Sequence, residues 1–239
     1  MVYSDKMYVG FSDVGSSLEM TNTAILRAFE NVCCMQGESV GDGISDSDGR
    51  WFLTAYRVRV FKRPAYNDRI IASTWSRCMK GVAASREFEI RSLDGQLCAA
   101  SLSNWARMNI QTKKLERMSP EAFAKYESEP DRHNFDDPWI QKLRDPEASG
   151  IAREFYVDRN LIDPNGHMNN VCYLDLAVRT LPEEVYRLGE ANAFDITYRK
   201  ATAYAETVNC VYSEDASGRF VTVKSHDMSE IKAVARFEG

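Results

Sequence analysis

The chain repeats one order of secondary-structure elements in its two halves, and this repetition limits the possible folds more than any other feature. Residues 22–32 carry apolar side chains at helical spacing, and Asn22 is of a type that caps helices. Residues 170–181 repeat this pattern behind Asn169 or Asn170. Aligning Asn22 with Asn170 gives an offset of 148 residues. We therefore expect two similar copies, each with a long helix near its start.

Each predicted helix is followed by a stretch that is rich in strands. Apolar and polar residues alternate between Tyr56 and Val60, which is typical of a strand with one buried face. Asp94-Gly95 favours a hairpin turn between two strands. The predicted strands cover residues 51–63, 69–77, 84–93 and 96–109 in the first copy and 193–201, 206–213, 219–226 and 230–238 in the second. One long helix and a curved antiparallel sheet, occurring twice, predict an α+β chain with a double (tandem) hotdog fold.

The segment between the two copies predicts a short helix and then a linker. Ser119-Pro120-Glu121 is a typical helix start, with serine as the cap and proline in the first turn. The sequence from Glu129 to Pro138 is mostly polar. We expect an N-terminal hotdog at residues 1–128, a linker at 129–150 and a C-terminal hotdog at 151–239.

Composition excludes several classes of protein. Apolar residues make up 44% of the chain, enough for a sizeable core, and no run approaches the roughly 18 apolar residues of a membrane span. The net charge of −5 argues against nucleic acid as the main partner. Residues 1–6 lack the pattern of a signal or transit peptide, so a cytoplasmic protein is expected. The six cysteines show no CxxC spacing and are expected to be reduced and buried.

Residues 163–170 concentrate chemistry directly before the second helix. They hold one carboxylate, three amides and one of only three histidines. Asn165-Gly166 favours a tight turn, because glycine accepts positive φ and asparagine tolerates it. The following helix leaves its first N–H groups unpaired and facing this turn. A base, a carboxylate, an amide and a positive helix end therefore converge, which suits attack on a carbonyl group.

The same stretch resembles the Asp-x-Asn-x-His-x-Asn-Asn signature of the acyl-acyl carrier protein (ACP) thioesterases, the plant plastid enzymes and their bacterial relatives. The first half is similar to that family as well, so the resemblance covers nearly the whole chain. The matching segments are Thr21-Asn22, Trp51 to Pro64, Asp68 to Trp75, Ser103 to Asn109, Arg117 to Glu121 and, after the signature, Tyr173. Without a transit peptide at its start, the chain is similar to the bacterial members.

The resemblance implies hydrolysis of the thioester between a fatty acyl chain and the phosphopantetheine arm of ACP. The products would be free fatty acid and ACP, which ends chain extension. An acyl tunnel is expected in the first half and the catalytic groups in the second. Asp163 would act as nucleophile or as base for water, His167 would move a proton, and Asn165 would orient water or bind the oxyanion. A purely structural role in the turn is the alternative for each.

One departure from the plant pattern restricts the mechanism. Plant members carry a Glu-Cys pair where this chain has Ala201 and Thr202. A Cys-His-Asn mechanism is therefore excluded at this position, and activation of water by that glutamate would need another carboxylate, such as Glu206. Cys172 is expected to pack in the helix rather than to act as a nucleophile.

Further residues are expected to contact the substrate or its carrier. Asn169 and Asn170 would bind substrate or cap the helix. Met20, Phe29, Trp51, Trp105 and Met108 would line the acyl tunnel, with ordinary core packing as the alternative. Because ACP is acidic, docking would use the basic residues Arg199, Lys200, Lys113, Lys114 and Arg117, with a solvated strand edge as the alternative. No cofactor, metal, nucleic acid or membrane partner is expected, and monomer and homodimer both stay open.

Three other functions compete with ACP thioester hydrolysis. The first is an acyl-CoA thioesterase on the same fold, and the second is a binding protein for acyl-ACP with a degenerate site. The third is a hotdog dehydratase, which the Asp-x-Asn-x-His pattern disfavours. An α/β-hydrolase is disfavoured because the chain has no G-x-S-x-G motif.

Overall fold

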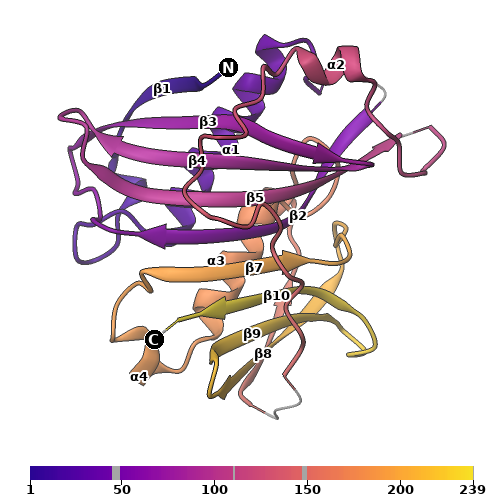
Figure 1. Cartoon of the computed structure of the whole chain (residues 1–239). Helices are drawn as coiled ribbons and strands as arrows, with labels where there is room; N and C mark the ends of the chain where they lie inside the picture. Colours follow the sequence, from indigo (N-terminus) through magenta and orange to yellow (C-terminus); the bar gives the residue numbers. More distant parts are fainter. Residues whose placement is uncertain (45–48, 110, 147–149, 239) are drawn as a thin grey trace. The chain divides into compact units, whose positions relative to one another are not determined.

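The computed structural model describes residues 1–44, 49–109, 111–146 and 150–238, and it divides into two compact units (Figure 1). The first unit is Met1–Ile140 and the second is Gln141–Gly239. Residues 129–140, which the sequence predicts as linker, belong to the first unit. Residues 147–149 of that predicted linker, and the terminal Gly239, lie outside the described residues.

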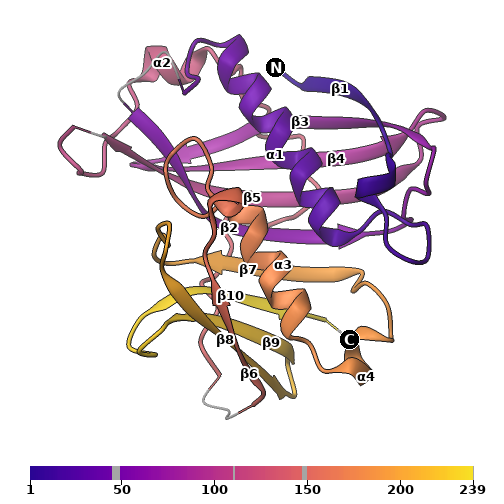
Figure 2. The ribbon, with the colours of Figure 1, turned by 180° about the vertical axis from the view of Figure 1, so that it is seen from behind.

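The first unit consists of one long helix and a five-stranded antiparallel sheet. Its elements are β1 (Tyr3–Tyr8), a 3-10 turn (Phe11–Asp13), α1 (Asn22–Ser39), β2 (Gly49–Val60), β3 (Arg69–Lys80), β4 (Ala83–Ser92), β5 (Leu97–Asn109) and α2 (Pro120–Ala124). The strand order is β1-β3-β4-β5-β2. Helix α1 lies across one face of this sheet (Figure 2). There Phe29 packs against Phe88 with 5.1 Å between the ring centroids, and both side chains are fully buried.

The second unit repeats this arrangement. Its elements are β6 (Ala152–Tyr156), a 3-10 turn (Arg159–Leu161), α3 (Asn170–Thr180), α4 (Glu183–Tyr186), β7 (Ala193–Tyr198), β8 (Thr207–Asp215), β9 (Gly218–Ser225) and β10 (Ile231–Phe237). The order β6-β8-β9-β10-β7 matches the first sheet strand for strand. Helix α3 packs on this sheet, and Leu174 and Ala177, three positions apart on the helix, are fully buried. The predicted helix-and-sheet pattern, occurring twice, is confirmed.

The first strand of each unit is the element that periodicity does not predict. The eight predicted strands correspond to β2–β5 and β7–β10, with ends that differ by a few residues. Strands β1 and β6 are short, pair on one side only and expose most of their side chains. They therefore lack the alternation of buried and exposed residues that identifies a strand in a sequence.

Helix caps were predicted with one error. The hydroxyl of Ser119 accepts the N–H of Ala122 at 3.1 Å, as expected for the start of α2. At α1 the capping residue is Thr21, not Asn22, because the Thr21 hydroxyl accepts the N–H of Ala24 at 3.1 Å. Asn22 is the first residue of the helix and is buried.

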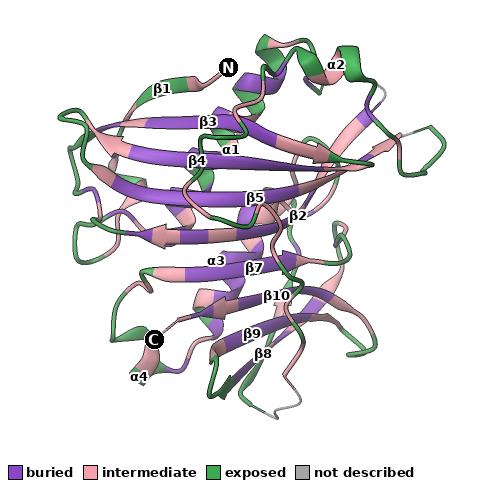
Figure 3. Cartoon of the chain, viewed as in Figure 1, coloured by how far each residue is buried: buried purple, intermediate pink, exposed green. Residues whose placement is uncertain are grey.

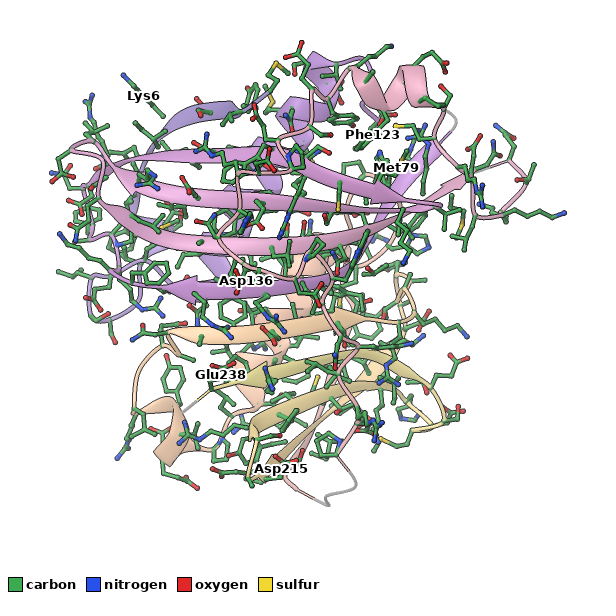
Figure 4. All side chains as sticks on the ribbon, in the orientation of Figure 1. Lys6, Met79, Phe123, Asp136, Asp215 and Glu238 are labelled. Carbon is green, nitrogen blue, oxygen red and sulfur yellow. The ribbon has the colours of Figure 1, made fainter. Side chains whose placement is uncertain are left out.

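A segment that we call the strap, residues 128–140, crosses the face of the first sheet opposite α1 (Figures 1 and 2). The indole N–H of Trp75 donates to the Arg132 carbonyl at 2.8 Å. Arg77 donates to the carbonyls of Phe135 at 2.6 Å and Asp136 at 2.8 Å. Figure 4 labels Asp136 on this segment. The strap therefore covers polar side chains that would otherwise be exposed, and buried residues follow the middle of β4 and β5 (Figure 3).

Glu87 binds the strap from within the sheet. Its carboxylate accepts the backbone N–H of Asn134 at 3.1 Å and lies 3.0 Å from Nη1 of Arg77. The side chain is fully buried, and this burial raises its pKa to about 7 even though Asn134 and Arg77 favour the charged form. The folded chain therefore takes up a proton at Glu87 at a higher pH than the unfolded chain does.

We predict that stability depends on the ionisation of Glu87. Its stabilising contribution is complete below about pH 4.5 and is lost as the pH rises through about 7. Between pH 5 and 8, the free energy of unfolding of the wild type should fall relative to that of Glu87→Gln by about 1–3 kcal/mol. Urea unfolding at several pH values measures this difference.

The neighbouring Glu89 provides a control of opposite sign. Burial raises its pKa, but the hydrogen bond from Arg91 and the charges of Arg91 and Arg132 outweigh this and lower it overall. Its stabilising contribution is therefore lost as the pH falls. Parallel pH profiles for the wild type and Glu87→Gln would contradict the assignment to Glu87.

Candidate active site

The loop before α3 is a tight turn that folds back on itself. The N–H of Asp163 donates to the His167 carbonyl at 2.8 Å, and the N–H of Gly166 donates to the Asp163 carbonyl at 2.9 Å. Gly166 has φ +81°, a left-handed conformation that suits glycine. The Asn-Gly turn predicted from the sequence is therefore present.

The Asp163 carboxylate organises this loop from one side. Its Oδ1 accepts the N–H of Asn165 at 2.8 Å and that of His167 at 3.4 Å. Its Oδ2 accepts the Asn165 side-chain amide at 3.2 Å. Asn165 is exposed, whereas Asp163 and His167 are half-buried. The structure therefore brings the Asp163 carboxylate and the Asn165 amide into contact at the surface of the second unit. The backbone N–H of His167 is hydrogen-bonded to the same carboxylate.

The loop is hydrogen-bonded to residues 202 and 203, which follow β7. His167 forms a backbone bridge with Ala203, and the N–H of Met168 donates to the Thr202 carbonyl at 2.8 Å. Asn169 is the cap of α3, since its side-chain oxygen accepts the N–H of Val171 at 2.8 Å. This confirms the capping alternative for one of the two asparagines; substrate contacts by either stay a prediction.

The first unit contains the same loop with different side chains. The N–H of Gly15 donates to the Glu19 carbonyl at 3.0 Å, and the N–H of Leu18 donates to the Gly15 carbonyl at 3.0 Å. The N–H of Met20 donates to the Pro64 carbonyl at 2.8 Å. These bonds match those of Asp163, Gly166 and Met168 one for one, so that Gly15, Ser17 and Glu19 take the places of Asp163, Asn165 and His167.

The two loops share their backbone bonds but differ in their side chains. The first loop forms its turn with Gly15, Ser17 and Glu19 at the three equivalent positions, and Leu18 adopts φ +59° there. It therefore has no amide or imidazole at these positions, and its carboxylate stands at the third position instead of the first. The backbone bonds of the turn can therefore form with other side chains at these positions. Catalytic roles for Asp163, Asn165 and His167 stay a prediction, with a structural role in the turn as the alternative.

Glu206 is not a free replacement for the missing glutamate of the plant pattern. Its Oε1 accepts the N–H of Ala203 at 3.0 Å, and its Oε2 lies 3.1 Å from Nζ of the buried Lys232. Burial raises the pKa of Glu206, but the Ala203 N–H and the ammonium of Lys232 lower it overall. Asp68 makes the equivalent bond in the first unit, accepting the N–H of Ala65 at 2.8 Å. The carboxylate therefore belongs to the turn in both copies.

The cysteines were predicted to be buried, and this is largely wrong. All six are free, but only Cys98 and Cys210 are buried and Cys34 is exposed. Cys172 lies half-buried in the first turn of α3, with its sulfur 4.0 Å from the Leu161 carbonyl.

The described residues contain no group of His, Cys, Asp and Glu side chains placed to hold a metal ion. Nor does that described part include a helix of the length and apolarity that crossing a bilayer requires.

The predicted tunnel residues all lie in the first unit. Met20 and Phe29 are buried, on the helix side of the core. The indole N–H of Trp51 donates to Asp42 at 2.8 Å, and that of Trp105 donates to the Ser103 hydroxyl at 2.6 Å. Met108 is half-buried near the end of β5. A role of these five residues in lining an acyl tunnel stays a prediction.

The predicted docking residues differ in the contacts that their side chains make. Arg199 donates to the Leu143 carbonyl at 2.5 Å, and Lys200 forms an ion pair with Glu230. Lys113 and Lys114 are exposed in the loop after β5. All four residues are exposed, and the side chains of Arg199 and Lys200 are held by contacts within the second unit.

Comparison with known proteins gives matches along most of the chain. Residues 1–126 match the acyl-ACP thioesterase N-terminal domain, and residues 145–236 match the acyl-ACP thioesterase C-terminal domain. The chloroplastic oleoyl-acyl carrier protein thioesterase 1 of Arabidopsis thaliana is 24% identical over 226 residues, which cover 87% of this chain and 62% of that protein. The chloroplastic oleoyl-acyl carrier protein thioesterase of Coriandrum sativum is 23% identical over 232 residues, 89% of this chain and 63% of its own length. The chain thus spans less than two thirds of these plant relatives.

Two solved structures superpose on nearly the whole chain. An acyl-ACP thioesterase from Bacteroides thetaiotaomicron matches with a TM-score of 0.85 at 18% identity, covering 99% of this chain and 97% of that one. The 12:0-ACP thioesterase from Umbellularia californica matches with a TM-score of 0.84 at 18% identity, covering 99% and 96%. At this identity the likeness shows the fold, and it confirms the predicted double hotdog.

The equivalence of the two loops yields a prediction for stability. The triple variant Asp163→Gly, Asn165→Ser, His167→Glu, which installs the side chains of the first copy, should fold with a free energy of unfolding within about 1–2 kcal/mol of the wild type. Urea unfolding followed by circular dichroism measures this. As a reference, Asn169→Ala removes a helix cap and should cost about 1 kcal/mol. Failure of the triple variant to fold would show that the second loop depends on these side chains.

Proposed function

Because the chain belongs to the acyl-ACP thioesterase family, we propose that it hydrolyses the thioester of fatty acyl-ACP, releasing free fatty acid and ACP and ending chain extension. One observation carries this proposal: a carboxylate, an amide and an imidazole occur together in residues 163–167, on a loop whose twin has Gly15, Ser17 and Glu19 at the same positions. The names of the plant and bacterial relatives support the substrate class.

In the proposed mechanism, Asp163 supplies the negative charge that starts the reaction. It either attacks the thioester carbonyl carbon itself or takes a proton from a water molecule that attacks this carbon. Asn165, whose amide lies 3.2 Å from Asp163, orients the water or donates to the developing oxyanion. The carbon–sulfur bond then breaks and the pantetheine thiolate leaves. If Asp163 attacked the carbon itself, the product of this step is an acyl–aspartate anhydride, which a water molecule hydrolyses to free fatty acid and the Asp163 carboxylate. In both cases His167 passes the proton lost by the attacking water to the thiolate. A thiol with a pKa of roughly 8.5 is a good leaving group, so little further assistance is needed.

The scheme uses no cysteine and no additional glutamate. Thr202 stands where the plant pattern has cysteine, and Glu206 is held by Ala203 and Lys232. Asp163, Asn165 and His167 are therefore the complete set of catalytic residues that we propose. The proposal has three further parts, each with its own test. They are docking of ACP through Lys113, Lys114, Arg199 and Lys200, an acyl tunnel in the first unit and a cytoplasmic location.

The direct test is release of fatty acid from acyl-ACPs of several chain lengths. Asp163→Ala and His167→Ala should each lower kcat by about 10²–10⁴-fold, since positioned acid–base groups contribute this much. Ser17→Ala and Glu19→Ala change the equivalent loop of the first copy and should leave kcat within about twofold of the wild type. Gas chromatography of the released acids gives both the rate and the chain-length preference.

Three outcomes would change the assignment. Equal loss of activity in the variants of the first and second loops would mean that the reaction centre is misplaced. Faster turnover of acyl-CoA than of acyl-ACP would identify an acyl-CoA thioesterase. Tight binding of acyl-ACP without any release of acid would identify a binding protein with a degenerate site.

A further inference from the structure

Two buried hydroxyl groups lie behind the candidate loop in the second unit. The Tyr173 hydroxyl, on α3, donates to Oγ1 of Thr202 at 3.0 Å. Tyr173 is 2% exposed and Thr202 is fully buried. The bond therefore links α3, which follows the 163–170 loop, to Thr202, whose backbone is hydrogen-bonded to that loop.

We infer that Tyr173 and Thr202 form a positioning pair that fixes the His167 loop for catalysis, an inference that rests on the proposed function. The connection is short and continuous. The Thr202 carbonyl accepts the N–H of Met168 at 2.8 Å, and Ala203 forms the backbone bridge with His167. The hydrogen bond to Tyr173 fixes the Thr202 side chain to α3. This restricts the movement of the backbone that carries the His167 imidazole.

The Tyr173 ring is itself held in place. It packs edge-on against Tyr198, with 5.6 Å between the ring centroids, and the Tyr198 hydroxyl donates to the Asn170 carbonyl at 3.0 Å. Burial raises the pKa of Tyr173 to about 12, so the phenol stays protonated and able to donate at any pH of interest.

The first copy shows that the fold does not need this pair. Ile25 takes the place of Tyr173 and is fully buried, and Pro64 takes the place of Thr202. The Pro64 carbonyl still accepts the N–H of Met20 at 2.8 Å. A hydrophobic residue and a proline therefore support the same backbone, and only the copy that carries the candidate catalytic groups has the hydroxyl pair.

This inference also assigns a role to the departure from the plant pattern. Thr202 occupies the position of the plant cysteine, but its hydroxyl is buried and bonded to Tyr173. It is therefore directed to α3 and acts through the loop rather than on the substrate.

The test compares variants that remove each hydroxyl while keeping the shape of the side chain. Tyr173→Phe and Thr202→Val should each lower kcat for acyl-ACP roughly ten- to a hundredfold with little change in KM, because a small displacement of a catalytic group costs about this much. The double variant should be no worse than the poorer single variant. Thr202→Ser restores the hydroxyl and should recover most of the lost kcat, whereas a packing defect would not be rescued in this way. Ile25→Val, in the equivalent place of the first copy, is the matched control and should keep the wild-type kcat.

A second readout does not depend on activity. The chain has three histidines, so the imidazole carbon-bound proton signals of His167 can be assigned by NMR with His167→Gln. Tyr173→Phe and Thr202→Val should shift or broaden these signals, and Ile25→Val should not. Unchanged His167 signals, or wild-type kcat in both single variants, would overturn the positioning pair. If the wild type released no fatty acid while the NMR shifts occurred, the proposed function would fail and the structural coupling of the pair would stand.

Discussion

Burial of one apolar helix face against one antiparallel sheet is the interaction on which each unit of this chain depends. In the first unit the contact includes Phe29 and Phe88, and in the second the buried helix residues include Leu174 and Ala177. The backbone hydrogen bonds of Met20 to Pro64 and of Met168 to Thr202 attach the start of each helix to its sheet. Because these bonds use main-chain atoms, the loops just before them are free to differ in side chains at three equivalent positions.

The candidate site follows from that freedom. Asp163 accepts two N–H groups and one amide of its own loop, which holds the carboxylate in a defined orientation while leaving the neighbouring Asn165 exposed. Two nearby carboxylates of the second unit are held by lysines, since Glu206 pairs with Lys232 and Glu230 pairs with Lys200. The proposed scheme therefore uses Asp163 as its carboxylate.

Sequence reasoning predicted the elements that have a strong period and failed where polar groups are buried by non-local contacts. The eight strands β2–β5 and β7–β10 and both long helices follow from the alternation or helical spacing of their apolar residues. The polar sequence of the strap predicts a linker, because nothing local reveals that Arg77 and Glu87 bind it from the sheet. The residue types of the 163–170 loop identify it as a candidate site. The link from Tyr173 to Thr202 does not follow from the sequence, because it joins the side chains of residues 29 positions apart.

The twin loop with Gly15, Ser17 and Glu19 has a consequence for how such a chain can change over generations. Since the two loops form the same backbone bonds with different side chains, the proposed catalytic side chains and the turn are separable in this fold. Under the proposed function, substitutions at positions 163, 165 and 167 are filtered mainly by activity, whereas substitutions in the Phe29–Phe88 contact are filtered mainly by stability. After a duplication, one copy can therefore become chemically silent while continuing to serve as scaffold. Inheritance of the fold and inheritance of the reaction are thus separable within one polypeptide.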